Sequence, residues 1–163
     1  MIKNKFHLLV ALFIMSATTA FAGYALANVQ AAFKEMYPAA NDVAWSQDDG
    51  YYCADFMLSD LEKNVWFNAQ AQWVMTQTEL ESTDRVPDAV YNAYAAGSYS
   101  DWQVLDVTLT EFPKWEPIYT IEVGQQNVDV KYQLFYAPNG ELLRIRNVRD
   151  RYDILGPSTF VPD

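Results

Sequence analysis

The sequence predicts an α+β fold made of two tandem units, each with one helix packed on a four-stranded antiparallel sheet. Two observations lead to this prediction. Two apolar helical stripes lie 57 residues apart, and each is followed by a tryptophan eight residues after its last tyrosine. Each stripe then precedes an ordered series of alternating apolar and polar segments, which is typical of half-buried strands. The predicted units span residues 29–80 and 86–147.

The helix of each unit is predicted from the spacing of its apolar residues. The first stripe, at i, i+4, i+7 and i+8, consists of Val29, Phe33, Met36 and Tyr37. The second repeats that spacing with Val86, Val90, Ala93 and Tyr94. Pro38 ends the first helix, and Pro87 stands near the start of the second, where proline is tolerated. The tryptophans that follow, Trp45 and Trp102, should therefore occupy equivalent positions.

The strands of each unit are predicted from matching segments. The pairs of segments are 52–56 with 119–123, 65–67 with 134–136, and 72–76 with 141–145. Short turns at 68–71 and 137–140 precede the last pair. The offset grows from 57 to 69 residues along the unit because the second copy carries extra residues around 111–115. Insertions confined to loops are what a structural repeat predicts.

Strand alternation assigns side chains to the two faces of the sheet. The side chains that we expect to face the helices are Tyr52, Ala54, Phe56, Val65, Phe67, Tyr119, Ile121, Val123, Leu134 and Tyr136. The side chains that we expect on the opposite, open face are Tyr51, Cys53, Asp55, Trp66, Thr120, Glu122 and Phe135. The segment 72–76 is apolar on both parities, so alternation does not decide whether Trp73 or Val74 points outward.

The N-terminal residues have the three parts of a cleavable secretory signal. Lys3 and Lys5 precede an apolar run over 8–15, and Ala20-Phe21-Ala22 forms an A-x-A cleavage pattern. We therefore expect a signal peptide over 1–22, one domain over 23–163 with a C-terminal tail at 148–163, and a periplasmic or secreted protein. A second A-x-A at 25–27 makes Asn28 the alternative mature start to Gly23. After cleavage no stretch is long enough for membrane insertion.

Charge and reactive residues exclude several function classes. Without 1–22 the chain has 9 basic and 21 acidic residues, so nucleic acid and anionic membranes are not expected partners. The one histidine, His7, lies in the signal peptide, which excludes histidine-based catalysis and metal ligation in the mature chain. Cys53 has no disulfide partner, and we expect it to be buried without a catalytic role. We expect no cofactor, no metal and no enzymatic activity.

Several of these segments resemble a known family. A helix ending in Tyr-Pro, the Val43-Ala-Trp45 motif, Tyr52-x-Ala-x-Phe56 and a Val-x-Phe strand resemble the PepSY-like proteins of the Gram-negative cell envelope. Their fold is similar to that of the β-lactamase inhibitor protein. The resemblance covers about residues 29–147. Two departures are the turn 68–71, where the family has Asp-x-x-Gly, and the insertion in the second unit.

The resemblance implies a continuous concave sheet surface, which in the inhibitor protein grips an enzyme. We therefore expect an exported, non-enzymatic binding or inhibitor-like module that recognises a protein or peptide of the cell envelope through its open face. The candidate ligand-binding residues are Asp49, Tyr51, Asp55, Trp66, Glu122 and Phe135. Exposed Tyr and Trp side chains are typical of binding hot spots. The competing interpretation is that other segments cover these aromatics and make an ordinary core.

The alternative function is a carbohydrate-binding protein or weak glycosidase that uses the same face. Glycoside hydrolysis needs two carboxylates across a sugar ring, and Asp55 and Glu122 stand at equivalent positions of the two units. An acidic surface also supplies such pairs as an ordinary solvated face. Asp48-Asp49-Gly50 is interpreted as a hairpin turn and not as a calcium loop, because the alternating oxygen ligands of such a loop are missing.

Overall fold

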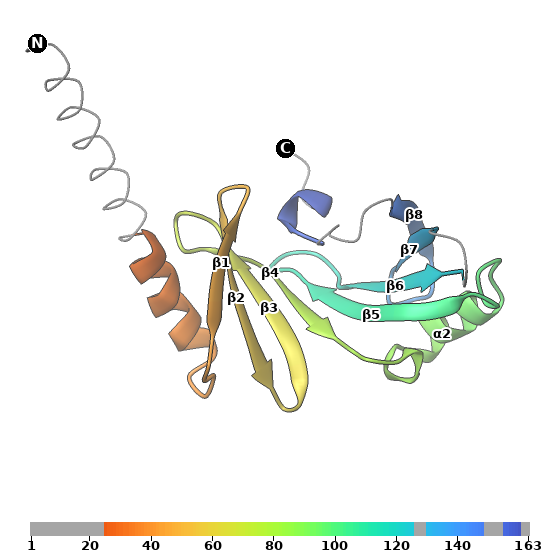
Figure 1. Cartoon of the computed structure of the whole chain (residues 1–163), viewed down its shortest axis with the longest axis horizontal. Coiled ribbons are helices and arrows are strands. Elements are labelled where there is room, and N and C mark those ends of the chain that lie inside the picture. The colour runs from red at the N-terminus through yellow and green to blue at the C-terminus, as the bar shows by residue number, and fades with distance from the viewer. Residues whose placement is uncertain (1–24, 126–129, 149–154, 161–163) are drawn as a thin grey trace, which may run out of the picture.

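The computed structural model describes residues 25–125, 130–148 and 155–160 (Figure 1). The predicted signal peptide lies outside these residues. The described chain forms one eight-stranded antiparallel sheet in the order β1 to β8, with two α-helices. The strands are β1 (Ala44–Asp48), β2 (Tyr51–Leu58), β3 (Leu61–Phe67), β4 (Trp73–Glu79), β5 (Gln103–Glu111), β6 (Ile118–Gly124), β7 (Lys131–Tyr136) and β8 (Leu142–Val148). The helical segments are 25–36, α2 (Asp88–Ala95), and the 3-10 turns η1 (Thr83–Arg85) and η2 (Pro157–Thr159).

The first helix, residues 25–36, packs on the first four strands. Val29 and Phe33 are buried against a cluster formed by Tyr52, Ala54, Phe56, Val65 and Phe67. The Phe33 ring meets the rings of Trp45 and Phe56 edge-on, with centroids 5.4 and 5.0 Å apart. These contacts confirm the face assignment of β2 and β3. Met36, which we expected in the apolar stripe, is 41% exposed because it lies in the last turn of the helix.

Helix α2 packs on the second four strands in the same manner. Val90 and Tyr94 are buried in a cluster with Val107, Ile121, Val123, Leu134 and Tyr136, and Trp102 packs against its edge. The face assignment of β6 and β7 is therefore also confirmed. Figure 1 shows the two helices on the same side of a sheet whose first four strands stand steeply against the last four. The equivalence of the two halves as a tandem repeat stays a prediction.

The extra residues of the second half lengthen β5. Whereas β1 has five residues, β5 has nine, and its last four pair with β4 from Thr76↔Glu111 to Glu79↔Thr108. The same stretch of β5 also pairs with β6. Residues 108–111, at the end of this long strand, therefore supply the backbone hydrogen bonds that join the two halves into one sheet.

The turns explain how the unusual sequence at 68–71 is accommodated. Gly140 adopts φ +86°, and Ala71, which aligns with it at the 69-residue offset, adopts φ +60°. The Asn68 side-chain oxygen accepts hydrogen bonds from the backbone N–H groups of Gln70 and Gln72, both at 3.0 Å. Both turns follow a register shift in the preceding strand. The asparagine thus stabilises a turn that lacks the usual glycine.

Candidate functional site

The open face of the sheet, opposite the two helices, has an apolar half and a polar half. The apolar half is a cluster of Cys53, Trp66, Met75 and Phe112, which we call the open-face cluster. Tyr51, Val74, Ile118 and Phe160 pack at its edge. Val74 therefore points to the open face, whereas Trp73 packs with the first helix. The two positions that alternation left undecided are resolved by this packing.

Two of the predicted binding aromatics face this way but are not accessible. Trp66 is 3% exposed and Phe135 is 2% exposed, so the expectation that they form an accessible surface is wrong. Phe112, which follows β5 directly, covers the cluster, and the Phe160 ring lies 5.4 Å from Phe112 and 5.8 Å from Phe135. Strand alternation gives the direction of a side chain, but it does not show which distant segment covers that side chain.

Cys53 is buried in the open-face cluster, as expected. Burial, and then the nearby charge of Asp55, raise the pKa of its thiol to about 12. The thiolate is the reactive form of cysteine, so this residue is held in its unreactive form at neutral pH. Cys53 therefore has a packing role.

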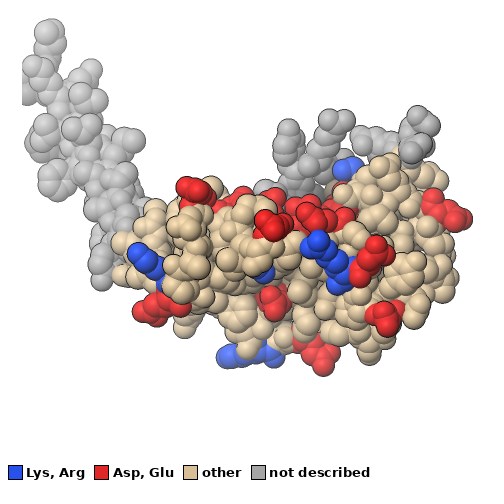
Figure 2. Space-filling view, turned by 90° about the horizontal axis from the view of Figure 1, so that it is seen from below, with Lys and Arg blue, Asp and Glu red and all other residues tan. Residues whose placement is uncertain are grey.

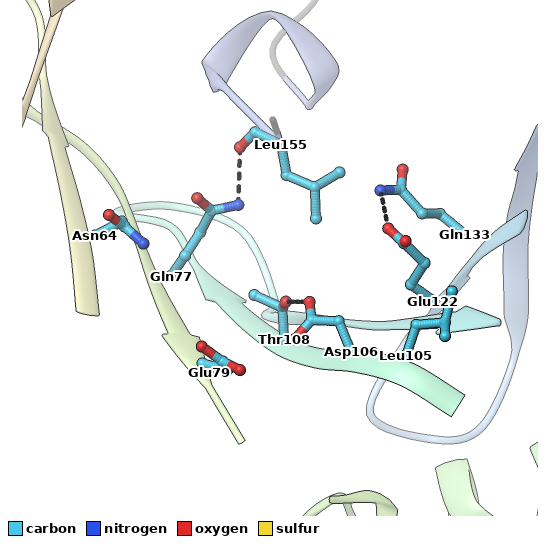
Figure 3. A pocket seen from close by; sticks show the side chains of 9 residues that line it. All are labelled: Asn64, Gln77, Glu79, Leu105, Asp106, Thr108, Glu122, Gln133 and Leu155. Carbon is cyan, nitrogen blue, oxygen red and sulfur yellow. Dashed lines mark hydrogen bonds between the residues drawn. The ribbon is translucent and has the colours of Figure 1, made fainter. Parts of the chain in front are cut away.

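The polar half of the open face contains a pocket of about 410 Å³ (Figure 3). Its lining residues are Asn64, Gln77, Glu79, Leu105, Asp106, Thr108, Glu122, Gln133 and Leu155. The central strands β3 to β7 supply all of these except Leu155, which comes from the C-terminal segment and points into the pocket from above. The pocket thus spans the junction where β4 pairs with β5.

Three carboxylates of this pocket have different surroundings. Glu122 accepts hydrogen bonds from Lys131 Nζ at 3.3 Å and from Gln133 Nε2 at 3.0 Å. Asp106 accepts a short hydrogen bond from the Thr108 hydroxyl, 2.6 Å. Partial burial of this largely exposed side chain, and then the charges of Asp106 and Glu62, raise the pKa of the Glu79 carboxyl. The pocket therefore favours a positively charged group.

Two buried glutamines are fixed at both ends of their side chains. Gln77 accepts a hydrogen bond from the Trp66 indole N–H at 3.3 Å and donates one to the Leu155 carbonyl at 2.8 Å. Gln133 accepts from Arg146 Nε at 2.9 Å and donates to Glu122. Because each side-chain amide accepts one hydrogen bond and donates another, both amides are held in a fixed orientation. Their N–H donors are therefore preorganised on the open face.

The remaining predicted site residues are dispersed. Asp49 lies in the β1–β2 turn with φ +46°, next to Gly50 at φ +80°, as a two-residue hairpin turn requires. Tyr51 packs against the open-face cluster. Asp55 lines a different pocket, with Asp42 and Glu62, so it does not face Glu122 across one site.

The sequence interpretation missed the residues that make up most of the central pocket. Gln77 and Glu79 continue the strand whose parity could not be decided, and Asp106 lies in the lengthened β5. Which side chains of β4 face the open side is decided by packing against other segments, with Trp73 against the first helix and Val74 against the open-face cluster. One usable signal was the alternation of Gln77 and Glu79 with Thr76 and Thr78, which extends the strand beyond residue 76.

Acidic side chains are spread over the face of the molecule seen in Figure 2, with fewer basic ones between them. This distribution agrees with the net charge of −10 for the whole chain. Within the described ranges, no helix has the length and apolar character needed to cross a membrane. The same residues contain no group of three or more His, Cys, Asp or Glu side chains placed to hold a metal ion.

Comparison with known proteins places this architecture in a family. The family described as "Putative beta-lactamase-inhibitor-like, PepSY-like" matches residues 50–144, which is more than half of the chain. The chain belongs to the PepSY-like family. The matched range runs from the β1–β2 turn into β8, so it contains all the strands of the central pocket and the junction between the halves.

Solved structures that are similar to this chain are consistent with this assignment. A DUF2874 family protein from Bacteroides ovatus is 63% identical, with a TM-score of 0.80 over 83% of this chain and 96% of its own. A protein from Bacteroides eggerthii described as "putative periplasmic proteins" is 49% identical, with a TM-score of 0.79 over 82% and 96%. A BLIP-like protein from Bacteroides fragilis is 37% identical, with a TM-score of 0.73 over 80% and 91%. No curated protein matches the chain.

Proposed function

We propose that this PepSY-like chain is an exported, non-enzymatic, inhibitor-like module that binds a protein or peptide of the cell envelope through its open face. The observation that carries the proposal is the asymmetry of the sheet. One face is covered by two helices, whereas the other holds a pocket of about 410 Å³ at the junction of the halves. The inhibitor-like family supports a protein partner.

The chemistry of the open face supports a partner with basic groups. Glu79, Asp106 and Glu122 line the pocket, and Lys131 is paired with Glu122. Opposite charge across an interface speeds encounter and fixes orientation. Of the original candidates, Asp49, Tyr51, Asp55 and Glu122 have accessible surface for such contacts, whereas Trp66 and Phe135 would support the face from beneath. In this proposal the two halves act as equivalent repeats that each supply one side of the surface.

A non-enzymatic role is supported by the state of the reactive groups. The thiol of Cys53 is held neutral by burial. Asp55 and Glu122 line different pockets, so they do not form the facing pair that a glycosidase uses. An exported location is supported by the N-terminal signal pattern and by the description of the Bacteroides eggerthii relative.

Carbohydrate binding is the second candidate because of a separate aromatic site. Trp115 is 55% exposed, and it lines a pocket of about 340 Å³ with Trp73, Gln72 and Lys114. An exposed indole beside amide and ammonium donors can stack on and hydrogen-bond a sugar. Binding to a panel of soluble oligosaccharides that is lost in Trp115→Ala would support this candidate over the protein ligand.

Site-specific photo-crosslinking tests the main proposal. A photoreactive phenylalanine analogue at Glu79 places the probe on the open face, and the same analogue at Tyr91, exposed on α2, is the matched control. In periplasm of the native host we expect a protein adduct from position 79 and none from position 91. Adducts only from position 91, or from neither position, would show that the open face is not the binding surface.

A further inference from the structure

The C-terminal segment, residues 155–160, lies over the open face, where Phe160 packs against the open-face cluster and Leu155 is held by Gln77 (Figure 1). We propose that residues 155–160 are a displaceable intramolecular occupant, and that the partner is a peptide that forms the same short 3-10 turn, with an aromatic residue at the Phe160 position and a basic residue at the Leu155 position. This inference rests on the proposed function and names the class of ligand for the same face.

The segment is held through its backbone carbonyls by side chains of the sheet. Gln77 Nε2 donates to the Leu155 carbonyl at 2.8 Å, and Arg144 Nη2 donates to the Thr159 carbonyl at 3.2 Å. Every residue of a peptide has such a carbonyl, so these two contacts do not depend on the sequence of the occupant. The Trp66 indole holds the Gln77 amide in the donating orientation. The donors are therefore placed for a chain whose carbonyls are spaced by a short 3-10 turn, as those of Leu155 and Thr159 are.

The Phe160 ring anchors the segment in an aromatic site. It packs edge-on between Phe112 and Phe135, and the Arg144 guanidinium lies 4.3 Å from the Phe135 ring centroid on the same surface. Gly156 and Pro157 are buried between this anchor and the first carbonyl contact. One aromatic side chain in a pocket, flanked by backbone contacts, is a common mode of peptide recognition.

The Leu155 side chain is a poor match for its surroundings. It points into the pocket that Glu79, Asp106 and Glu122 line (Figure 3). Lys131 and Gln133 pair with Glu122, whereas partial burial, and then the like charges of Asp106 and Glu62, raise the pKa of Glu79. A Lys or Arg side chain at this position would place a positive charge among these carboxylates, which leucine does not do. A partner with that residue would therefore replace the segment.

Competition between the segment and a partner follows from effective concentration. An occupant tethered to its site through a short linker acts at about millimolar concentration. Weak contacts are then sufficient to cover the aromatic site in the free protein. A peptide in solution must bind more tightly than the segment to displace it, which selects for the additional basic contact.

Labelled peptides test the inference on the full chain. A fluorescein-labelled, end-capped peptide of residues 155–160 is titrated with the wild-type protein and with Phe160→Ala, and binding is followed by fluorescence anisotropy. We expect the peptide to bind Phe160→Ala at least tenfold more tightly than wild type, because its aromatic site is vacated. A peptide with Leu155→Arg should bind at least tenfold more tightly than the native peptide. A peptide with Phe160→Ala should bind at least tenfold more weakly than the native peptide. Equal affinity for the two proteins, or for the three peptides, would overturn the inference.

Hydrogen exchange measured on the wild-type protein tests the same inference without relying on the folding of the Phe160→Ala variant. A displaceable segment opens without global unfolding, so the amides of 158–160 should exchange at least a hundredfold faster than those of β6. Equal protection would mean that the segment is a permanent part of the core, and the inference would fail. A protein adduct from position 79 without peptide binding would overturn this inference alone. Peptide binding without any adduct would count against the proposed envelope partner and not against the peptide site.

Discussion

Trp66 and Trp115 are the same residue type in opposite surroundings. Trp66 is 3% exposed and donates its indole N–H to Gln77, whereas Trp115 is 55% exposed. We expect Trp66→Ala to lower the free energy of unfolding by about 3–5 kcal/mol, because it leaves a cavity and an unpaired amide oxygen. Trp115→Ala should change it by about 0.5 kcal/mol or less. Chemical denaturation of both variants measures the difference, and equal losses would contradict the assigned burial.

Glu79 gives a prediction about pH. The raised pKa of its carboxyl means that the folded state disfavours the charged form. Glu79→Gln should therefore raise the free energy of unfolding at pH 7, by less than about 1 kcal/mol because the side chain is exposed and solvent screens its charge.

Because the pKa of Glu79 is raised in the folded state, the stability gain of Glu79→Gln should depend on pH. At pH 3 the carboxyl is protonated in both folded and unfolded states, so wild type and Glu79→Gln should differ little. The gain should then appear as the pH rises through the ordinary and the raised pKa of the carboxyl. Urea denaturation from pH 3 to pH 7 measures it, with 1 M NaCl as the control that weakens the repulsion. A gain that is the same at pH 3 and pH 7 would show that charge is not its cause.

At the residue scale, the sequence predicted the face to which a side chain points better than it predicted whether that side chain is exposed to solvent. Alternation correctly placed Tyr52, Val65 and Leu134 against the helices, because a strand has a fixed period of two. It could not predict that Phe160 would cover Phe135, since that contact joins a strand to a segment 25 residues later in the chain. The acidic pocket was missed for a similar reason, because its walls come from five strands.

At the element scale, two glycines in turns provide a matched pair. Gly50 and Gly140 have φ of +80° and +86°, and a Cβ on Gly50 would meet nothing, whereas one on Gly140 would meet the backbone carbonyl of Ala89 at the start of α2. Gly50→Ala should cost about 1–2 kcal/mol from the left-handed conformation alone. Gly140→Ala should cost a further 1–3 kcal/mol or so, because the turn and the helix must move apart. Thermal or urea unfolding compares them, and equal costs would argue against close packing of this turn on α2.

The elements themselves were largely predictable, apart from the junction. Helix stripes and strand pairs follow local periodicities, and Pro38 and Pro87 mark their limits. The role of the insertion was not predictable, because extra residues near 111–115 look like a longer loop. In the structure the extra length is divided between β5, which runs to Glu111, and a loop over 112–117, in which Phe112 packs in the open-face cluster. Pairing between β4 and β5 joins segments that are distant in the sequence, so no local sequence pattern predicts it.

At the scale of the whole molecule, the packing of the first helix bears on the signal cleavage site. Ala25 and Leu26 pack against the cluster around Val29 and Phe33. Cleavage after Ala22 keeps these contacts, whereas cleavage after Ala27 would remove them. We therefore expect the exported protein to begin at Gly23, as measured by intact mass spectrometry of protein from its native host. A chain that begins at Asn28, or one that keeps Met1, would contradict this prediction.

The continuous sheet predicts that the two halves unfold together. Strands β4 and β5 are paired, and the open-face cluster joins Trp66 and Met75 of the first half to Phe112 of the second. Val29 and Val90 are both fully buried, each in the helix core of its own half. Val29→Ala and Val90→Ala should each cost on the order of 2 kcal/mol. Each variant should shift one and the same calorimetric transition by about 5 °C. The calorimetric and van't Hoff enthalpies should agree in both variants and in wild type.

Independent halves would instead give two transitions, with Val29→Ala moving one of them and Val90→Ala the other. That result would show that the β4–β5 junction is too weak to make the halves one folding unit.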